Sequence, residues 1–106
     1  MERRRVVVTG LGAINAIGHN VEETWKSIKE GVCGIDEITN YDKELTKVKI
    51  AGEVKNFNAA DYLDKKAVRK MDRFTQFGVI AAKEAFKDAG LKIEEIDADR
   101  FGVVVS

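Results

Sequence analysis

The stretch Arg5-Val-Val-Val-Thr-Gly-Leu-Gly12 combines a run of β-branched apolar residues with two closely spaced glycines. Its apolar residues do not alternate with polar ones, which predicts a strand buried on both faces, as in a parallel sheet. A second uninterrupted apolar run, Phe101-Gly-Val-Val-Val-Ser106, predicts another strand of the same kind. Both strands need cover on two faces and neighbours in a sheet. We therefore expect an α/β fold.

Two helices are expected between these runs. Asn20 is positioned to cap a helix that runs to about Glu30, with Glu23 as the capping-box acid and Gly31 as the stop. Asp64 is positioned to cap a long helix over residues 65–89, and Gly90 ends it in the same way.

The remaining segments predict one more strand and three connections. Residues 31–46 have turn chemistry, and residues 48–54 alternate apolar with polar side chains, which predicts a half-exposed strand. Asn58 is positioned to cap a short turn through Tyr62, and the acidic segment 92–100 reads as a connection. The order strand, helix, strand, helix, strand predicts an α/β layer with right-handed crossovers. Since these strands cannot complete a covered sheet, we expect residues 1–106 to be the amino-terminal part of a larger domain.

Composition excludes several classes of protein. The 106 residues carry 18 basic and 18 acidic side chains, so the net charge is zero and wholesale nucleic-acid binding is not indicated. A single cysteine rules out a disulfide framework and favours a reducing, cytoplasmic compartment. No apolar run approaches the roughly 20 residues of a membrane-spanning helix.

The glycines after the first valine run raise the hypothesis of a dinucleotide cradle. In that motif, glycines let backbone amides approach a pyrophosphate at a helix N-terminus. Here Asn15 stands where the third glycine belongs, and the helix begins too late to meet a phosphate held by this loop. We favour a tight backbone turn at Gly10 and Gly12.

Cys33 and His19 are the single thiol and the single imidazole of the chain. A nucleophilic dyad needs the base within hydrogen-bond reach of the thiol, and an oxyanion site beside it. Cys33 follows a helix end, where no helix N-terminus offers such a site, so a structural role is favoured for it. His19 reads as a loop residue before the helix cap. No residues have metal-ligand spacing, and we expect neither a catalytic residue nor a metal or cofactor site.

Basic side chains recur along the first part of the long predicted helix. On a continuous helix they fall within about 140° of arc, and they are Lys65, Lys66, Arg69, Lys70 and Arg73. The opposite side is expected to pack inward, through Val68, Met71, Phe74, Gly78, Ala82 and Ala85. Such a basic face is either an ordinary solvated surface or a docking site for an acidic partner.

Several blocks of this sequence resemble the β-ketoacyl-acyl-carrier-protein synthases, the condensing enzymes of fatty-acid synthesis. The opening Arg3-Arg-Arg-Val-Val-Val-Thr-Gly-Leu-Gly12 is one, and Ile17-Gly18 with Val21-Glu22 and Trp25 follows it. Further blocks resemble the synthase II branch: Gly34-Ile35, Lys49-Ile-Ala-Gly-Glu-Val54, Tyr62-Leu-Asp-Lys-Lys66, Arg69-Lys-Met-Asp-Arg-Phe74, Lys83-Glu-Ala85, Asp88-Ala-Gly-Leu91 and Gly102-Val-Val-Val105. Together they cover essentially the whole chain.

The resemblance implies a thiolase-like fold, layered αβαβα, of which residues 1–106 form the amino-terminal portion. It implies a cytoplasmic, homodimeric acyltransferase that condenses an acyl group with malonyl carrier protein. In this family the catalytic Cys and two His lie downstream of the matched segment, and Cys33 and His19 do not match them. Basic residues on the helix matching residues 65–73 help to hold the acidic acyl carrier protein, and Lys66, Arg69 and Lys70 match best.

Two alternatives remain open at this stage. A non-catalytic condensing-enzyme partner, resembling a chain-length factor, shares this region but lacks the nucleophile. A small nucleotide-binding α/β protein is the other alternative, and the family resemblance argues against it because condensing enzymes use no nicotinamide.

Overall fold

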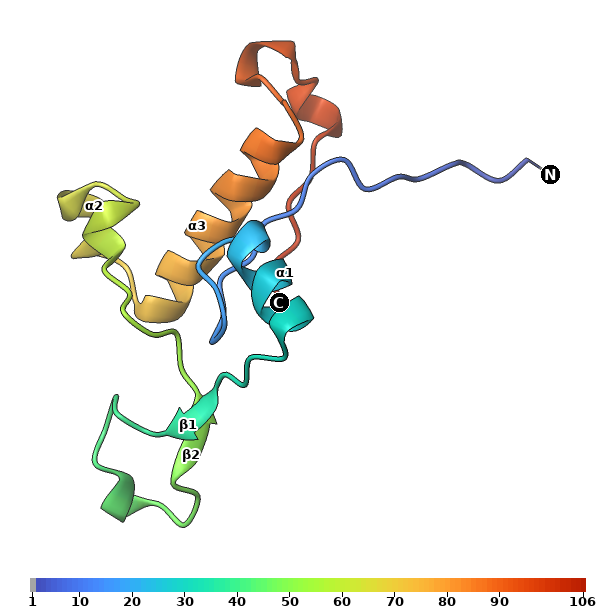
Figure 1. Cartoon of the computed structure of the whole chain (residues 1–106). Helices are drawn as coiled ribbons and strands as arrows, with labels where there is room; N and C mark the ends of the chain where they lie inside the picture. Colours follow the sequence, from blue (N-terminus) through green and yellow to red (C-terminus); the bar gives the residue numbers. More distant parts are fainter. Residues whose placement is uncertain (1) are drawn as a thin grey trace.

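The computed structural model describes residues 2–106, which form three α-helices, a two-stranded sheet and several single turns of 3-10 helix (Figure 1). The elements, in chain order, are α1 (Val21–Glu30), β1 (Ile35–Glu37), β2 (Ile50–Gly52), α2 (Lys65–Val68) and α3 (Arg73–Asp88). The 3-10 turns are Lys43–Leu45, Ala59–Asp61, Ile93–Glu95 and Ala98–Arg100.

Helix α1 begins and ends where the sequence predicts. The Asn20 side chain accepts a hydrogen bond from the Glu23 N–H at 2.8 Å, which satisfies one free donor of the first turn. The Glu23 carboxylate accepts from the His19 N–H at 2.7 Å, one residue earlier than in a standard capping box. Gly31 ends the helix with φ 69°, in the left-handed region that glycine adopts most readily.

The predicted continuous helix over residues 65–89 is wrong, because it is interrupted between α2 and α3. After α2 the backbone hydrogen bonds span three residues, as in a 3-10 helix. Lys70 N–H donates to the Ala67 carbonyl, and Met71 N–H donates to the Val68 carbonyl. Asp72 is extended (ψ 160°), which stops the helical path, and neither it nor Asp64 caps through its side chain. The Gln76 amide donates to the carbonyls of Val68 and Met71, at 3.4 and 3.3 Å, in place of helical N–H groups. The predicted end at Gly90 is confirmed, with φ 68°.

The sheet is a small antiparallel hairpin that lies away from α1 and α3 (Figure 1). Ile35 pairs with Gly52 and Glu37 pairs with Ile50. The strand predicted over residues 48–54 is thus confirmed in its centre. Its partner β1 lies in the segment 31–46, where the prediction of a connection is wrong.

The two valine-rich runs do not form strands among residues 2–106. Val6 is 90% exposed and Val104 is 97% exposed, and neither run has a ladder of backbone partners. A β-branched run can favour extended backbone, but a strand exists only when a neighbouring strand accepts and donates its hydrogen bonds. The described fold is therefore mixed α/β with few strands, and the parallel layer is not formed within these residues.

Helix α3 packs, through its alanines, against the loop that carries Gly10 and Gly12, which we call the glycine loop. A Cβ atom added to Gly12 would overlap the Ala81 carbonyl, and one added to Gly10 would overlap the carbonyl of Ala85. The two glycines therefore permit a close approach between two backbones, which the sequence analysis had interpreted as a tight turn.

The predicted inward face of the long helix is partly wrong. Phe74 is 75% exposed, and Gly78 and Ala82 are exposed as well. Ile80 is the buried residue of α3, with 7% exposure, and it lies on the other side of the helix. Val68, Met71 and Ala85 of the same predicted face are half-buried, and the interruption after α2 separates the first two from the face of α3.

The contact between the glycine loop and α3 gives the first prediction. Gly12→Ala should lower the free energy of unfolding by about 1–3 kcal/mol, since the new methyl group would force the loop off the helix. Gly78→Ala is the matched control on α3, because an added Cβ meets nothing within 4 Å. It should raise stability by about 0.5–1 kcal/mol. Equilibrium urea unfolding measures both, and equal stability of the two variants would contradict the packing described here.

Candidate functional site

Four exposed cations form the basic patch, which we define as Lys65, Lys66, Arg69 and Lys70. The two lysines at its start lie on α2, and the other two residues lie on the turn that leads to α3. Among residues 2–106, ion pairs link Lys43 to Glu37 and Lys49 to Glu44, and neither pair involves the basic patch. Its charges are therefore available to an acidic partner.

Arg73, which the sequence analysis grouped with these residues, has a different environment. Its Nη2 donates to the Val54 carbonyl at 3.2 Å. Its guanidinium carbon lies 5.4 Å from the ring centroids of both Phe57 and Phe77. Because the helix is interrupted, the five cations do not form one continuous helical face.

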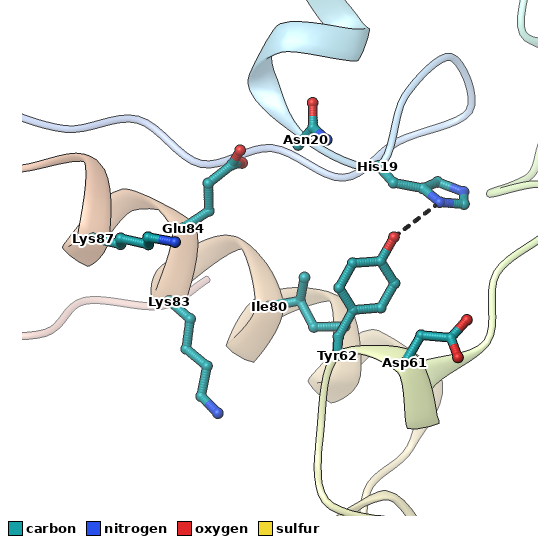
Figure 2. A pocket seen from close by; sticks show the side chains of 8 residues that line it. All are labelled: His19, Asn20, Asp61, Tyr62, Ile80, Lys83, Glu84 and Lys87. Atoms are coloured by element: carbon teal, nitrogen blue, oxygen red, sulfur yellow. Dashed lines mark hydrogen bonds between the residues drawn. The ribbon is translucent and has the colours of Figure 1, made fainter.

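A cleft of about 420 Å³ lies between the start of α1, the turn before α2, and α3 (Figure 2). The Tyr62 hydroxyl lies 3.3 Å from Nδ1 of His19, and Nε2 of His19 lies 2.6 Å from the Lys55 carbonyl oxygen. A carbonyl oxygen only accepts, so Nε2 carries the proton and Nδ1 accepts from the Tyr62 hydroxyl. The imidazole thus joins three separate segments of the chain. The residues that line the cleft are His19, Asn20, Asp61, Tyr62, Ile80, Lys83, Glu84 and Lys87.

The carboxylates of α3 bind the backbone of the glycine loop. Glu84 accepts from the N–H groups of Ala13 at 2.8 Å and Val21 at 3.1 Å, and Asp88 accepts from the Leu11 N–H at 3.0 Å. A dinucleotide cradle would direct such donors at a pyrophosphate. Here they are already paired with side-chain anions, and α3 fills the space beside Gly10 and Gly12. This geometry argues against the nucleotide-binding alternative.

Cys33 and His19 both line a smaller cleft of about 300 Å³, but the structure does not join them as a dyad. The exposed Cys33 thiol donates to the Ile35 carbonyl at 3.8 Å. Both nitrogens of His19 are engaged by Lys55 and Tyr62, so neither is free to take the thiol proton. Within residues 2–106, no three His, Cys, Asp or Glu side chains gather as metal ligands. No helix in the same range is long and apolar enough to cross a bilayer.

Comparison with known proteins identifies the family. The model of the "Beta-ketoacyl synthase, N-terminal domain" family matches residues 3–106. The chain belongs to the β-ketoacyl synthase family. This confirms the resemblance found in the sequence. The match covers the basic patch, the cleft and the glycine loop, so all the features described above lie inside the family's amino-terminal domain.

Relatives and solved structures of the β-ketoacyl synthase family agree with this assignment. The 3-oxoacyl-[acyl-carrier-protein] synthase 2 of Staphylococcus aureus (strain COL) is 54% identical over 102 residues, which cover 96% of this chain and 25% of that protein. Its namesake from Synechocystis is 45% identical and covers 99% of this chain and 25% of its own length. The chain therefore spans about a quarter of the length of the curated relatives it matches.

Two solved ketosynthase structures have a similar backbone. The ishigamide ketosynthase/chain length factor superposes with a TM-score of 0.79 and 37% identity, over 90% of this chain and 24% of that one. A type II polyketide ketosynthase in complex with its acyl-carrier protein gives a TM-score of 0.67 and 29% identity, over 91% of this chain and 25% of that one.

Sequence reasoning missed the roles of Glu84, Asp88 and Tyr62. Glu84 and Asp88 are one helical turn apart, on the same helical face as Ala81 and Ala85. Two acidic residues on a face of otherwise small residues could have indicated that this face binds backbone N–H groups. Tyr62 gave no such signal, because its partner His19 lies far away in the sequence.

The carboxylate of Glu84 gives a second prediction. Glu84→Gln should lower the free energy of unfolding by about 1–3 kcal/mol, because an amide N–H₂ group in place of one carboxylate oxygen would face the Val21 N–H, and the remaining bonds would lose their charge. Glu94→Gln, at an exposed position on the turn after α3, is the matched control and should change stability little. Thermal unfolding of both variants measures the difference, and equal melting temperatures would contradict the assigned role of Glu84.

Proposed function

We propose that the full-length protein is a 3-oxoacyl-acyl-carrier-protein synthase II. It would be a cytoplasmic, homodimeric transferase that condenses an acyl group with malonyl carrier protein during fatty-acid elongation. The observation that carries this proposal is 54% identity to a synthase 2 over 96% of the chain. The family match to residues 3–106 supports the same conclusion.

Residues 1–106 are proposed to form the amino-terminal portion of the synthase domain, in a layered αβαβα fold. The exposed valines at both ends of the chain support this proposal. Val8 is 79% exposed and Val105 is 86% exposed, and each belongs to an uninterrupted apolar run. Pairing of these runs in a covered sheet would remove their apolar surface from water and satisfy their backbone groups.

The basic patch is proposed as a docking surface for the acidic acyl carrier protein. Its four cations are exposed and lie outside the two ion pairs found among residues 2–106. Clustered charges of one sign steer an oppositely charged partner and raise the encounter rate, although each exposed contact contributes little free energy. Relatives that carry the acyl carrier protein in their names, and a solved ketosynthase complexed with its carrier, support this choice of partner.

Charge reversal tests the docking surface. In the full-length protein, the triple variant Lys66→Glu, Arg69→Glu and Lys70→Glu should raise KM for the carrier-protein substrate about tenfold. It should also weaken the dependence of that KM on salt concentration. The control reverses three exposed lysines outside the patch, at Lys26, Lys47 and Lys92, and so changes net charge equally. An equal effect of both triple variants would mean that net charge, and not this surface, governs recognition.

The 106-residue chain alone should show no condensing activity. Its thiol, Cys33, donates to a backbone carbonyl, and both nitrogens of its imidazole, His19, are engaged. Incubation with malonyl carrier protein should release no carbon dioxide above background, and mass spectrometry should detect no acylated chain. Acylation of Cys33 would overturn this prediction.

A second candidate function is a non-catalytic condensing-enzyme partner. The superposition on a ketosynthase/chain length factor, with a TM-score of 0.79, supports this second function. Mass spectrometry of the full-length protein after exposure to acyl carrier substrates separates the two. A covalent acyl adduct supports the synthase, and its absence under conditions that acylate a known synthase supports the partner.

A further inference from the structure

Arg73 lies at the junction of three segments. It is the first residue of α3, its Nη2 donates to the Val54 carbonyl just after β2, and its guanidinium lies over Phe57 and Phe77. We infer that Arg73 is a positioning residue, which fixes the basic patch through its contacts with the Phe57 and Phe77 rings and does not itself contact the carrier protein. This inference rests on the proposed docking function.

The geometry of this contact requires a guanidinium. The rings of Phe57 and Phe77 meet edge to face with centroids 5.0 Å apart, and the Arg73 guanidinium lies 5.4 Å from each centroid. A planar, delocalised cation can lie over aromatic faces and still direct an N–H at a carbonyl. A lysine at this position keeps the charge, but its ammonium is a compact, strongly hydrated group that is less suited to contact two ring faces.

Besides the Gln76 amide, which bonds the carbonyls of Val68 and Met71, the basic patch depends on its two ends for its shape. Helix α2 has only four residues, and neither Asp64 before it nor Asp72 after it makes a side-chain cap. Such a short helix is not stable by itself in water. Leu63, 7% exposed, anchors the start of the patch. Arg73 anchors its end, immediately after the turn.

The contacts of Arg73 also separate it from the partner-binding cations. Arg73 is exposed, but a guanidinium that turned outward to a carboxylate would give up the Val54 carbonyl and both rings. Lys65, Lys66, Arg69 and Lys70 have no ion-pair partner to give up within residues 2–106.

The test measures binding of fluorescently labelled acyl carrier protein to the full-length protein over a series of salt concentrations. The test variants are Arg73→Lys and Arg73→Gln. Arg100→Lys is the matched control, since Arg100 is exposed on the 3-10 turn Ala98–Arg100. Lys66→Gln serves as the reference for loss of a direct contact.

For a positioning residue, Arg73→Lys and Arg73→Gln should both weaken binding about fivefold. The slope of log Kd against log salt should stay at the parent value for both. Arg100→Lys should bind like the parent, and Lys66→Gln should weaken binding and reduce the slope. Parent-like affinity of Arg73→Lys, or a reduced slope for Arg73→Gln, would overturn the inference and make Arg73 a docking contact or a bystander.

Amide hydrogen exchange gives a second readout that needs no carrier protein. Arg73→Lys should speed exchange in residues 65–72 relative to Arg100→Lys, because the end of the basic patch is released. Unchanged exchange there would contradict the inference even if binding weakened. The docking proposal fails separately, if the triple charge reversal binds the carrier as the parent does. If that triple variant loses binding and Arg73→Lys does not, only the positioning role is wrong.

Discussion

The close approach of Gly10 and Gly12 to α3 is the constraint on which the described structure depends. Any side chain at these positions would overlap the carbonyls of Ala85 and Ala81. The loop and the helix can therefore meet only where glycines on the loop face alanines on the helix. This contact joins segments from opposite ends of the chain. It also brings the loop N–H groups within reach of the Glu84 carboxylate, which binds Ala13 and the first residue of α1.

Polar contacts extend this arrangement to the candidate site. His19, just before α1, bonds the Lys55 carbonyl and Tyr62, and so connects the segment after β2 and the turn before α2 to the same loop. Arg73 continues the connection from Val54 to α3. His19 and Arg73, which the sequence offers as candidate site residues, thus hold segments of the chain together. The four cations of the basic patch stay exposed and lie close together in the chain, which is what a charge-steered docking surface requires.

Local signals in the sequence were reliable where neighbouring residues decide the structure. Asn20 and Gly31 set the ends of α1, because capping depends on backbone groups only a few residues away. The basic residues were found for the same reason, but their arrangement was not. Periodicity assumes a continuous helix, and the Gln76 amide and the extended Asp72 break it. The single helical face predicted for Arg73 and the four patch residues is therefore not formed.

The sequence alone determined the family, the first helix, the glycines that end α1 and α3, and the identity of the exposed cations. Each of these is encoded in local motifs or in blocks that resemble the family. Tertiary structure decided the rest. Whether a valine run is a strand depends on a partner backbone, and none pairs with Val6 or Val104 within residues 2–106. Whether an arginine binds a partner or an aromatic ring of its own chain depends on what folding places beside it. For Arg73 that neighbour is Phe57, which is separated from it in the sequence by helix α2 and the turns on either side.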